Sequence, residues 1–251
     1  MVSRRILLAD LGKGTLALAV LGIACARSGS PATNGGPSTT SGPTPSTGQP
    51  AGSAPTSATW HRVNLGFVSA YLIARSGEVA IIDTGVAGSV ADIEAGITAA
   101  GFGWDAVGTV ILTHHHADHQ GSLPDVMTEA PAATAYAGAE DIAAISSPRP
   151  VTAVGDGDQI FGLTIVATPG HTPGHVAVLD PELGLLLAGD AIRGEAGGVV
   201  GPNPRFTEDM TVANESVVKL GKLTFEIVAF GHGDPLEGAA STKVAELAAR
   251  L

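Results

Sequence analysis

Four short apolar runs in this chain each end in histidine or aspartate, and this repetition constrains the fold more than any other feature of the sequence. The runs cover residues 110–112, 165–167, 185–187 and 227–229. Apolar runs of this length between turn residues are typical of buried strands. The carboxyl ends of strands that run to one edge of a sheet meet there, so we expect one shared sheet to bring the four polar endings together.

The four endings supply imidazoles and carboxylates. Seven of these side chains are candidate metal ligands: His114, His116, Asp118, His119, His171, Asp190 and His232. Imidazole nitrogen and carboxylate oxygen suit Zn²⁺, and they also suit Fe or Mn. Seven ligands exceed what one catalytic tetrahedral ion uses, so the pattern predicts two ions that share a carboxylate and a water.

The spacing of the histidines separates ligands from neighbours. Two residues that are two positions apart in extended backbone point to the same side, which brings His114 and His116 together and turns His115 away. We therefore expect His115 to be a non-ligand, and His175 to be structural. A surface tract with weak metal affinity would explain residues 114–116, but it would leave the other three endings unexplained.

Composition excludes several classes of function. The 251-residue chain carries 13 Lys and Arg against 24 Asp and Glu, a formal charge of −11, which argues against nucleic acid as a partner. One cysteine excludes a disulfide framework and a cysteine-based zinc site. We expect the partner to be a small-molecule substrate; the oligomeric state is left open.

Strand-like runs alternate with amphipathic helices after residue 59. The hydrophobic spacing predicts helices over 90–100 and 209–220, the second with Thr207 as its cap. Residues 137–145 are also expected to be helical, and residues 160–167 are expected to form one strand. The last helix is expected to place Leu251 on its apolar face.

The first 26 residues are typical of an export signal, because a basic start precedes a short apolar run. Arg4 and Arg5 resemble a twin-arginine signal, and an ordinary signal start is the alternative. Residues 24–26 fit a cleavage site, whereas residues 21–25 resemble a lipobox that would make Cys25 a lipid anchor. We expect an exported protein that is secreted or anchored at the cell surface, with no membrane contact except through such an anchor.

Residues 27–58 consist almost entirely of Ser, Thr, Gly, Pro and Ala. Such a segment has too few apolar side chains to offset the entropy of ordering, so it is predicted to be a disordered linker. The folded domain is then expected to span residues 59–251.

These motifs resemble those of the metallo-β-lactamase superfamily. The run His114-His115-His116-Ala117-Asp118-His119 matches its His-x-His-x-Asp-His signature, and His171, Asp190 and His232 match its later ligand positions in order. The resemblance implies an α/β fold, a four-layer αβ/βα sandwich of two mixed β-sheets with helices on the outer faces and the metal site at one edge.

The resemblance also implies roles for the residues. His114, His116 and His171 would bind the first ion, and Asp118, His119 and His232 the second. Asp190 would bridge the two ions. Asp83 would be a buried structural residue near the site, in a turn similar to the Asp-Thr-Gly turn of the superfamily.

Within the superfamily the motifs are most similar to the glyoxalase II branch, which hydrolyses hydroxyacyl thioesters. Those enzymes hold glutathione with basic residues in a C-terminal region, where this chain has only Lys243 and Arg250, so a glutathione substrate is not expected. The β-lactamases proper usually lack an aspartate at the position of Asp190, which argues against, but leaves open, that activity.

The resulting hypothesis is an exported, dinuclear zinc-dependent hydrolase. A hydroxide that bridges the two ions would attack a thioester, ester, lactone or amide carbonyl, with Asp118 as the catalytic residue that orients it. Two alternatives remain: a mononuclear iron enzyme similar to persulfide dioxygenases, and a surface protein that binds metal without turnover. Candidate substrate contacts lie in two loops: Phe67, Arg193, Arg205 and Phe206.

Overall fold

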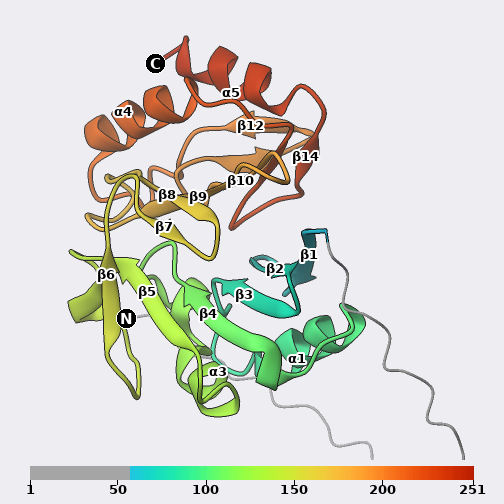
Figure 1. The fold of residues 1–251 in the computed structure, drawn as a ribbon. Coiled ribbons are helices and arrows are strands. Elements are labelled where there is room, and N and C mark those ends of the chain that lie inside the picture. Colours follow the sequence, from blue (N-terminus) through green and yellow to red (C-terminus); the bar gives the residue numbers. More distant parts are fainter. Residues whose placement is uncertain (1–56) are drawn as a thin grey trace, which may run out of the picture. The chain divides into compact units, whose positions relative to one another are not determined.

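The computed structural model of the chain describes residues 57–251, and Figure 1 shows their arrangement. The predicted export signal and all but the last two residues of the predicted linker lie outside the described residues. The structure contains two six-stranded sheets and a separate two-stranded one.

The first sheet has the strand order β1-β2-β3-β4-β5-β6. Its first three strands pair antiparallel, and β3 to β6 pair parallel. Its strands are β1 Thr59–Asn64, β2 Ser69–Arg75, β3 Glu78–Ile82, β4 Val107–Ile111, β5 Thr134–Gly138 and β6 Val151–Val154. The central strands are buried on both faces, which explains their almost continuous apolar sequence.

The second sheet has the order β14-β13-β10-β9-β8-β7, in which only β10 and β13 pair parallel. Its strands are β7 Gln159–Ile160, β8 Leu163–Ala167, β9 Val176–Asp180, β10 Leu185–Leu187, β13 Ile227–Ala229 and β14 Leu236–Glu237. A separate hairpin, β11 Arg193–Glu195 and β12 Gly198–Val200, lies between β10 and β13 in the chain.

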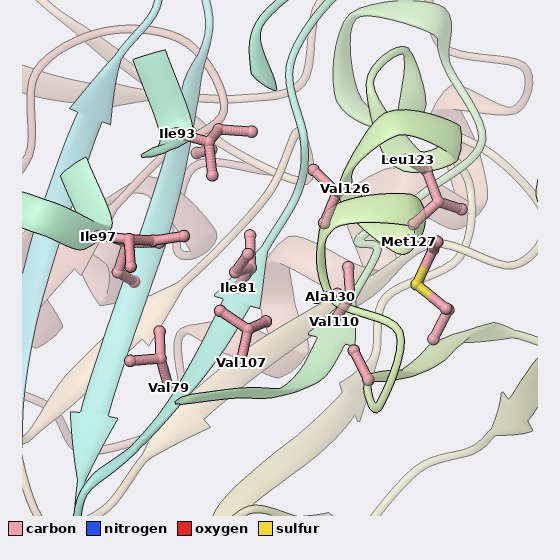
Figure 2. Packing of buried hydrophobic residues seen from close by; sticks show 14 of the residues in the cluster. Val79, Ile81, Ile93, Ile97, Val107, Val110, Leu123, Val126, Met127 and Ala130 are labelled. Atoms are coloured by element: carbon pink, nitrogen blue, oxygen red, sulfur yellow. The ribbon is translucent and has the colours of Figure 1, made fainter. Parts of the chain in front are cut away.

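Three apolar clusters hold the layers together. Alternate residues of β2 belong to two of them. Ala70 and Leu72 are part of the cluster under the helices Val90–Ala99 and Leu123–Glu129, whereas Tyr71 and Ile73 are part of the cluster between the sheets. Figure 2 shows Ile97 and neighbouring side chains of the first cluster. The third cluster lies between the second sheet and the helices Met210–Leu220 and Ala240–Ala248. The expected αβ/βα sandwich is therefore confirmed.

The helices are α1 Val90–Ala99, α2 Ala117–Gln120, α3 Leu123–Glu129, α4 Met210–Leu220 and α5 Ala240–Ala248, with 3-10 turns η1 Trp104–Ala106 and η2 Ile142–Ala144. Helices α1 and α3 cover the outer face of the first sheet, and α4 and α5 cover that of the second (Figure 1). The short helix α2 lies in the loop after β4. Among residues 57–251, every helix is too short or too polar to cross a bilayer.

Three expectations about local structure are wrong. Residues 137–145 are the end of β5 followed by η2, because pairing with β4 and β6 outweighs the helical composition. Residues 160–167 form a hairpin of two strands, since Phe161 and Gly162 both have positive φ and reverse the chain. Leu251 lies beyond α5 and is 55% exposed.

The cap of α4 is Asp209 and not Thr207. The Asp209 carboxylate accepts hydrogen bonds from the backbone N–H groups of Thr211 and Val212, which have no partner within the helix. Thr207 is thus available for a different contact, described below.

Tyr71 joins the two sheets, because its hydroxyl donates a 2.7 Å hydrogen bond to the carbonyl of Phe230, directly after β13. Burial raises the pKa of Tyr71 from 10.0 to about 12. Between these values the unfolded chain loses this proton while the folded chain keeps it, so the free energy of unfolding is expected to fall as pH rises. The whole loss is on the order of 2 to 3 kcal/mol.

Urea unfolding of the wild type and Tyr71→Phe across this pH window measures the effect. The variant is expected to lose this part of the pH dependence, whereas Tyr136→Phe, at a partly exposed position, should retain it. Equal slopes in the wild type and Tyr71→Phe would show that another group is responsible.

Candidate metal centre

The four polar endings meet, but they come from two sheets and not from one. β4 belongs to the first sheet, whereas β8, β10 and β13 belong to the second. Backbone hydrogen bonds join the endings: Val176 N donates to Thr113 O at 2.8 Å, and Gly231 N donates to Gly189 O at 2.9 Å. The site is therefore built at an edge where the two sheets face each other.

Three imidazoles form the first group, His114, His116 and His171, whose ligand atoms all lie within 4.8 Å of one another. His116 Nδ1 is 3.0 Å from His114 Nε2 and 3.0 Å from His171 Nε2. Zinc–nitrogen bonds of about 2.0–2.1 Å in a tetrahedral site separate two ligand nitrogens by roughly 3.3 Å. The spacing therefore fits one ion.

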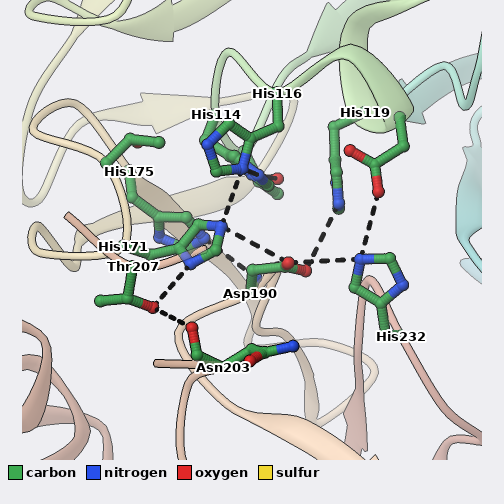
Figure 3. Close-up of polar contacts among 12 residues, drawn as sticks. His114, His116, His119, His171, His175, Asp190, Asn203, Thr207 and His232 are labelled. Atoms are coloured by element: carbon green, nitrogen blue, oxygen red, sulfur yellow. Dashed lines mark hydrogen bonds and ion pairs between the residues drawn. The ribbon is translucent and has the colours of Figure 1, made fainter. Parts of the chain in front are cut away.

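A second group contains Asp118, His119 and His232, again with ligand atoms within 4.8 Å of one another. Asp190 lies between the groups, as Figure 3 shows. Its Oδ2 is 3.3 Å from His232 Nε2 and 3.5 Å from His171 Nε2, and its Oδ1 is 3.4 Å from His119 Nε2. The structure thus brings all seven predicted ligands together, with one carboxylate between two triplets.

Two buried atoms at the centre indicate that a cation belongs there. His119 Nε2 and Asp190 Oδ1 are both buried and have no hydrogen-bond partner among residues 57–251. A buried polar atom without a partner costs about 1–3 kcal/mol, so native proteins rarely keep one. A metal ion bound by both atoms would remove this cost, and the donor set therefore fits zinc.

Hydrogen bonds on the far side of the rings orient four of the five imidazoles. His114 Nδ1 contacts Thr113 Oγ1 at 3.0 Å, and His119 Nδ1 contacts Asp83 Oδ2 at 2.8 Å. Each leaves Nε2 directed into the site, as metal-binding histidines require.

His171 and His232 are oriented in the same way by residues of two other loops. His171 Nδ1 contacts Thr207 Oγ1 at 3.1 Å, and the Thr207 hydroxyl donates to Asn203 O, as Figure 3 also shows. His232 Nδ1 is 2.7 Å from the carbonyl oxygen of Phe67.

Asp83 lies beside the site and is not among the seven candidate ligands. Its carboxylate accepts hydrogen bonds from the Thr113 backbone N–H and hydroxyl, at 2.7 and 2.8 Å, in addition to its contact with His119. Its φ of +61° is a left-handed conformation that aspartate tolerates better than most residues. Asp83 thereby connects the end of β3 to the loop after β4.

The charge states suit a cation site. Burial lowers the pKa of His171 to about 4 and lowers the pKa of His114 well below its usual value, so both rings are neutral and keep a lone pair. Burial alone would raise the pKa of Asp190, but the facing imidazole of His119 holds it well below the usual range. For the imidazole of His232, burial acts in the opposite direction and would lower the pKa, but hydrogen bonds to Asp118 and Asp190 raise it to about 10. The carboxylates therefore stabilise positive charge here.

Two histidines of the same loops lie outside the groups of candidate ligands. His175 is buried, and its Nε2 accepts a 3.0 Å hydrogen bond from the backbone N–H of Asp190. His115 donates its backbone N–H to Asp141, at 3.0 Å. Neither the contact of Thr207 with His171 nor the role of Asp141 is visible in the sequence, because both contacts join segments that are far apart in the chain.

A cavity of about 560 Å³ opens over the ligands. Its lining includes Phe67, Phe206 and Arg193, three of the four candidate substrate contacts. Arg205 is outside the lining, with its guanidinium 5.8 Å from the centre of the Phe206 ring. Both phenylalanines are exposed, at 64% and 58%, which gives the mouth of the cavity two apolar walls.

Comparison with known proteins identifies the family. The sequence pattern of the metallo-beta-lactamase superfamily matches residues 63–232, which include all seven converging side chains. The chain therefore belongs to the metallo-β-lactamase superfamily, most of whose members are hydrolases.

Curated relatives include a protein of no stated activity and an enzyme. The uncharacterized protein YobT of Bacillus subtilis (strain 168) is 28% identical over 199 residues, 66% of this chain and 83% of YobT. The hydroxyacylglutathione hydrolase of Dechloromonas aromatica (strain RCB) is 35% identical over 131 residues, which is 51% of this chain. The match spans only 45% of that enzyme.

Solved structures share the fold at low sequence identity. The metallo-beta-lactamase family protein TTHA1429 from Thermus thermophilus has a TM-score of 0.63 at 23% identity, covering 76% of this chain and 78% of its own. Metallo-beta-lactamase SMB-1, bound to 2-mercaptoethanesulfonate, has a TM-score of 0.62 at 19% identity, covering 78% and 92%.

Proposed function

We propose that this protein is an exported dinuclear zinc-dependent hydrolase that cleaves a thioester, ester, lactone or amide. One observation carries the proposal: Asp190 lies between two triplets of ligand atoms, and its buried Oδ1 accepts no hydrogen bond from residues 57–251. A structural zinc site would need only four ligands and would leave no room for a substrate. Seven ligands beneath an open cavity instead suit catalysis.

The residues divide into two metal positions that share Asp190. His114, His116 and His171 would hold the first ion, and Asp118, His119 and His232 would hold the second. Two zinc ions bound there supply a water of lowered pKa and polarise the substrate carbonyl.

Asp118 is the residue suited to proton transfer. It is only partly buried, lines the cavity, and stands 3.4 Å from His232 Nε2. The hydrogen bond with His232 lowers the pKa of Asp118, which keeps the carboxylate ionised at neutral pH. Asp118 would therefore orient the attacking water and accept its proton.

The cavity wall suits a substrate with an apolar part beside its carbonyl group. Phe67 and Phe206 are both exposed, and Arg193, whose Nε donates to the carbonyl of Gly201, is a further residue of the lining. We propose that the two rings contact the apolar part, and that Arg193 holds a carboxylate where the substrate has one. Arg205 would then act indirectly, through its contact with Phe206.

A substrate panel tests this function. Lactones, thioesters, esters and β-lactams would be offered to the full chain, with zinc, iron and manganese measured on the same sample. We expect hydrolysis of at least one of these classes by protein that contains about two zinc ions per chain, and loss of activity on chelation. Two bound zinc ions with no turnover of any class would favour metal binding alone, and a single iron would favour the persulfide dioxygenase-like alternative.

A further inference from the structure

A buried carboxylate outside the seven candidate ligands contacts two of the loops that carry them. Asp141 follows β5 and is 1% exposed. Its Oδ2 accepts hydrogen bonds from the backbone N–H of His115 at 3.0 Å and from the Thr172 hydroxyl at 2.6 Å. Its Oδ1 accepts the backbone N–H of Gly174 at 2.7 Å.

These contacts bracket the first metal position. His115 stands between His114 and His116, and Thr172 directly follows His171, so one carboxylate reaches the chain beside all three imidazoles of that position. Gln120 holds the same residue from the other side, because its side-chain amide donates a 2.5 Å hydrogen bond to the carbonyl of His115. The peptide of His115 is therefore held from both sides by side chains.

The two loops that Asp141 contacts pack closely against each other. A Cβ atom on Gly174 would lie 2.6 Å from the backbone nitrogen of Asp141 and 2.8 Å from its carboxylate carbon. A Cβ on Gly138 would lie 1.9 Å from the carbonyl oxygen of Gly174. The two loops therefore approach each other at backbone distance beside Asp141.

We propose that Asp141 is a positioning residue that sets the geometry of the three-imidazole metal position, and that it acts on that position selectively. It holds the loop of His114 and His116 against the loop of His171. The second position has its own supports, because Asp83 orients His119 and the Phe67 carbonyl orients His232. The inference rests on the proposed metal centre.

Asparagine in place of Asp141 satisfies only one loop at a time. Its amide has one oxygen and one NH₂ group, whereas the site presents N–H donors to both carboxylate oxygens. If the amide oxygen accepts the N–H of His115, the NH₂ group faces the N–H of Gly174, and two donors oppose each other. In the reverse orientation, the NH₂ group faces the N–H of His115 instead. Asp141→Asn therefore releases one loop without opening a cavity.

The experiment measures zinc affinity at each position separately. His232→Ala removes a ligand of the second position and leaves the three-imidazole position intact. His171→Ala removes a ligand of the three-imidazole position and leaves the second position intact. Asp141→Asn is added to each, and zinc binding by the metal-free full chain is measured by competition with a chromogenic chelator. We expect Asp141→Asn to weaken zinc binding about ten- to a hundredfold in the His232→Ala background, the range typical of residues that orient metal ligands. In the His171→Ala background the change should stay below about twofold, because two ligands of the second position, His119 and His232, are held by Asp83 and by the Phe67 carbonyl instead of by Asp141.

Two further variants separate positioning from general destabilisation. Asp180→Asn also alters a buried carboxylate that accepts two backbone N–H groups, but at the opposite end of β9, and it should leave both affinities unchanged. Thr172→Val removes a single contact of Asp141 and should weaken only the three-imidazole position, which keeps the test open if Asp141→Asn fails to fold.

Equal weakening in both backgrounds, or none in either, would overturn the positioning role while leaving the proposed function intact. Failure of both single-position variants to bind zinc before Asp141 is changed would instead refute the metal centre itself, and this inference with it.

Discussion

Replacement of Asp190 with alanine is expected to abolish zinc binding at both positions, and not at one alone. The carboxylate lies 3.3–3.5 Å from ligand nitrogens of both triplets, so its removal takes a ligand from each ion. The substitution also removes the more buried of the two ligand carboxylates that balance positive charge in the site. We expect metal content to fall from about two zinc ions per chain to well below one, and hydrolysis to fall with it.

Metal analysis after dialysis against a fixed low zinc concentration measures this loss. Asp234→Ala is the matched control, because Asp234 is two residues from His232 but its side chain is 91% exposed and pairs with Arg62. The control should keep both ions. An Asp190→Ala protein that still holds two zinc ions would contradict the bridging position assigned to this carboxylate.

Asp118→Asn is expected to lower kcat by about a hundred- to ten-thousandfold at saturating zinc, the usual contribution of a positioned proton acceptor. Asparagine preserves the shape of the side chain and can still offer an oxygen to a metal, but it cannot accept a proton at neutral pH. The loss of activity should therefore exceed any loss of bound zinc.

Steady-state kinetics at several zinc concentrations separates the two effects. Asp125→Asn, in the exposed face of the neighbouring helix α3, provides a control that should leave kcat unchanged. If added zinc restored full activity to Asp118→Asn, Asp118 would be a ligand without a part in proton transfer.

The sequence was most informative where the signal is local. Each polar ending follows its apolar strand directly, so the converging residues and the strands that carry them were both visible in short segments. The distribution of strands between sheets was not visible, because β4 pairs with β3 and β5 while β8, β10 and β13 pair elsewhere, and such pairing depends on contacts between distant residues.

The missed residues have a similar physical explanation. Asp141 contacts Thr172 across 31 positions and His115 across 26, and it lies in a segment whose alanine-rich composition favoured helix. Thr207 was read as a helix cap because its hydroxyl precedes a helical segment, but Asp209 is closer to the first turn and takes that place. In both cases a tertiary partner outweighed the local preference.

Each metal position draws on both sheets: the loop after β4 supplies two ligands to each triplet, and the loops of the second sheet supply the third. A bound ion would thus cross-link the two halves of the sandwich. Neither half alone contains all the ligands of either metal position. The proposed hydrolysis would therefore require both halves of the sandwich to be folded and packed against each other.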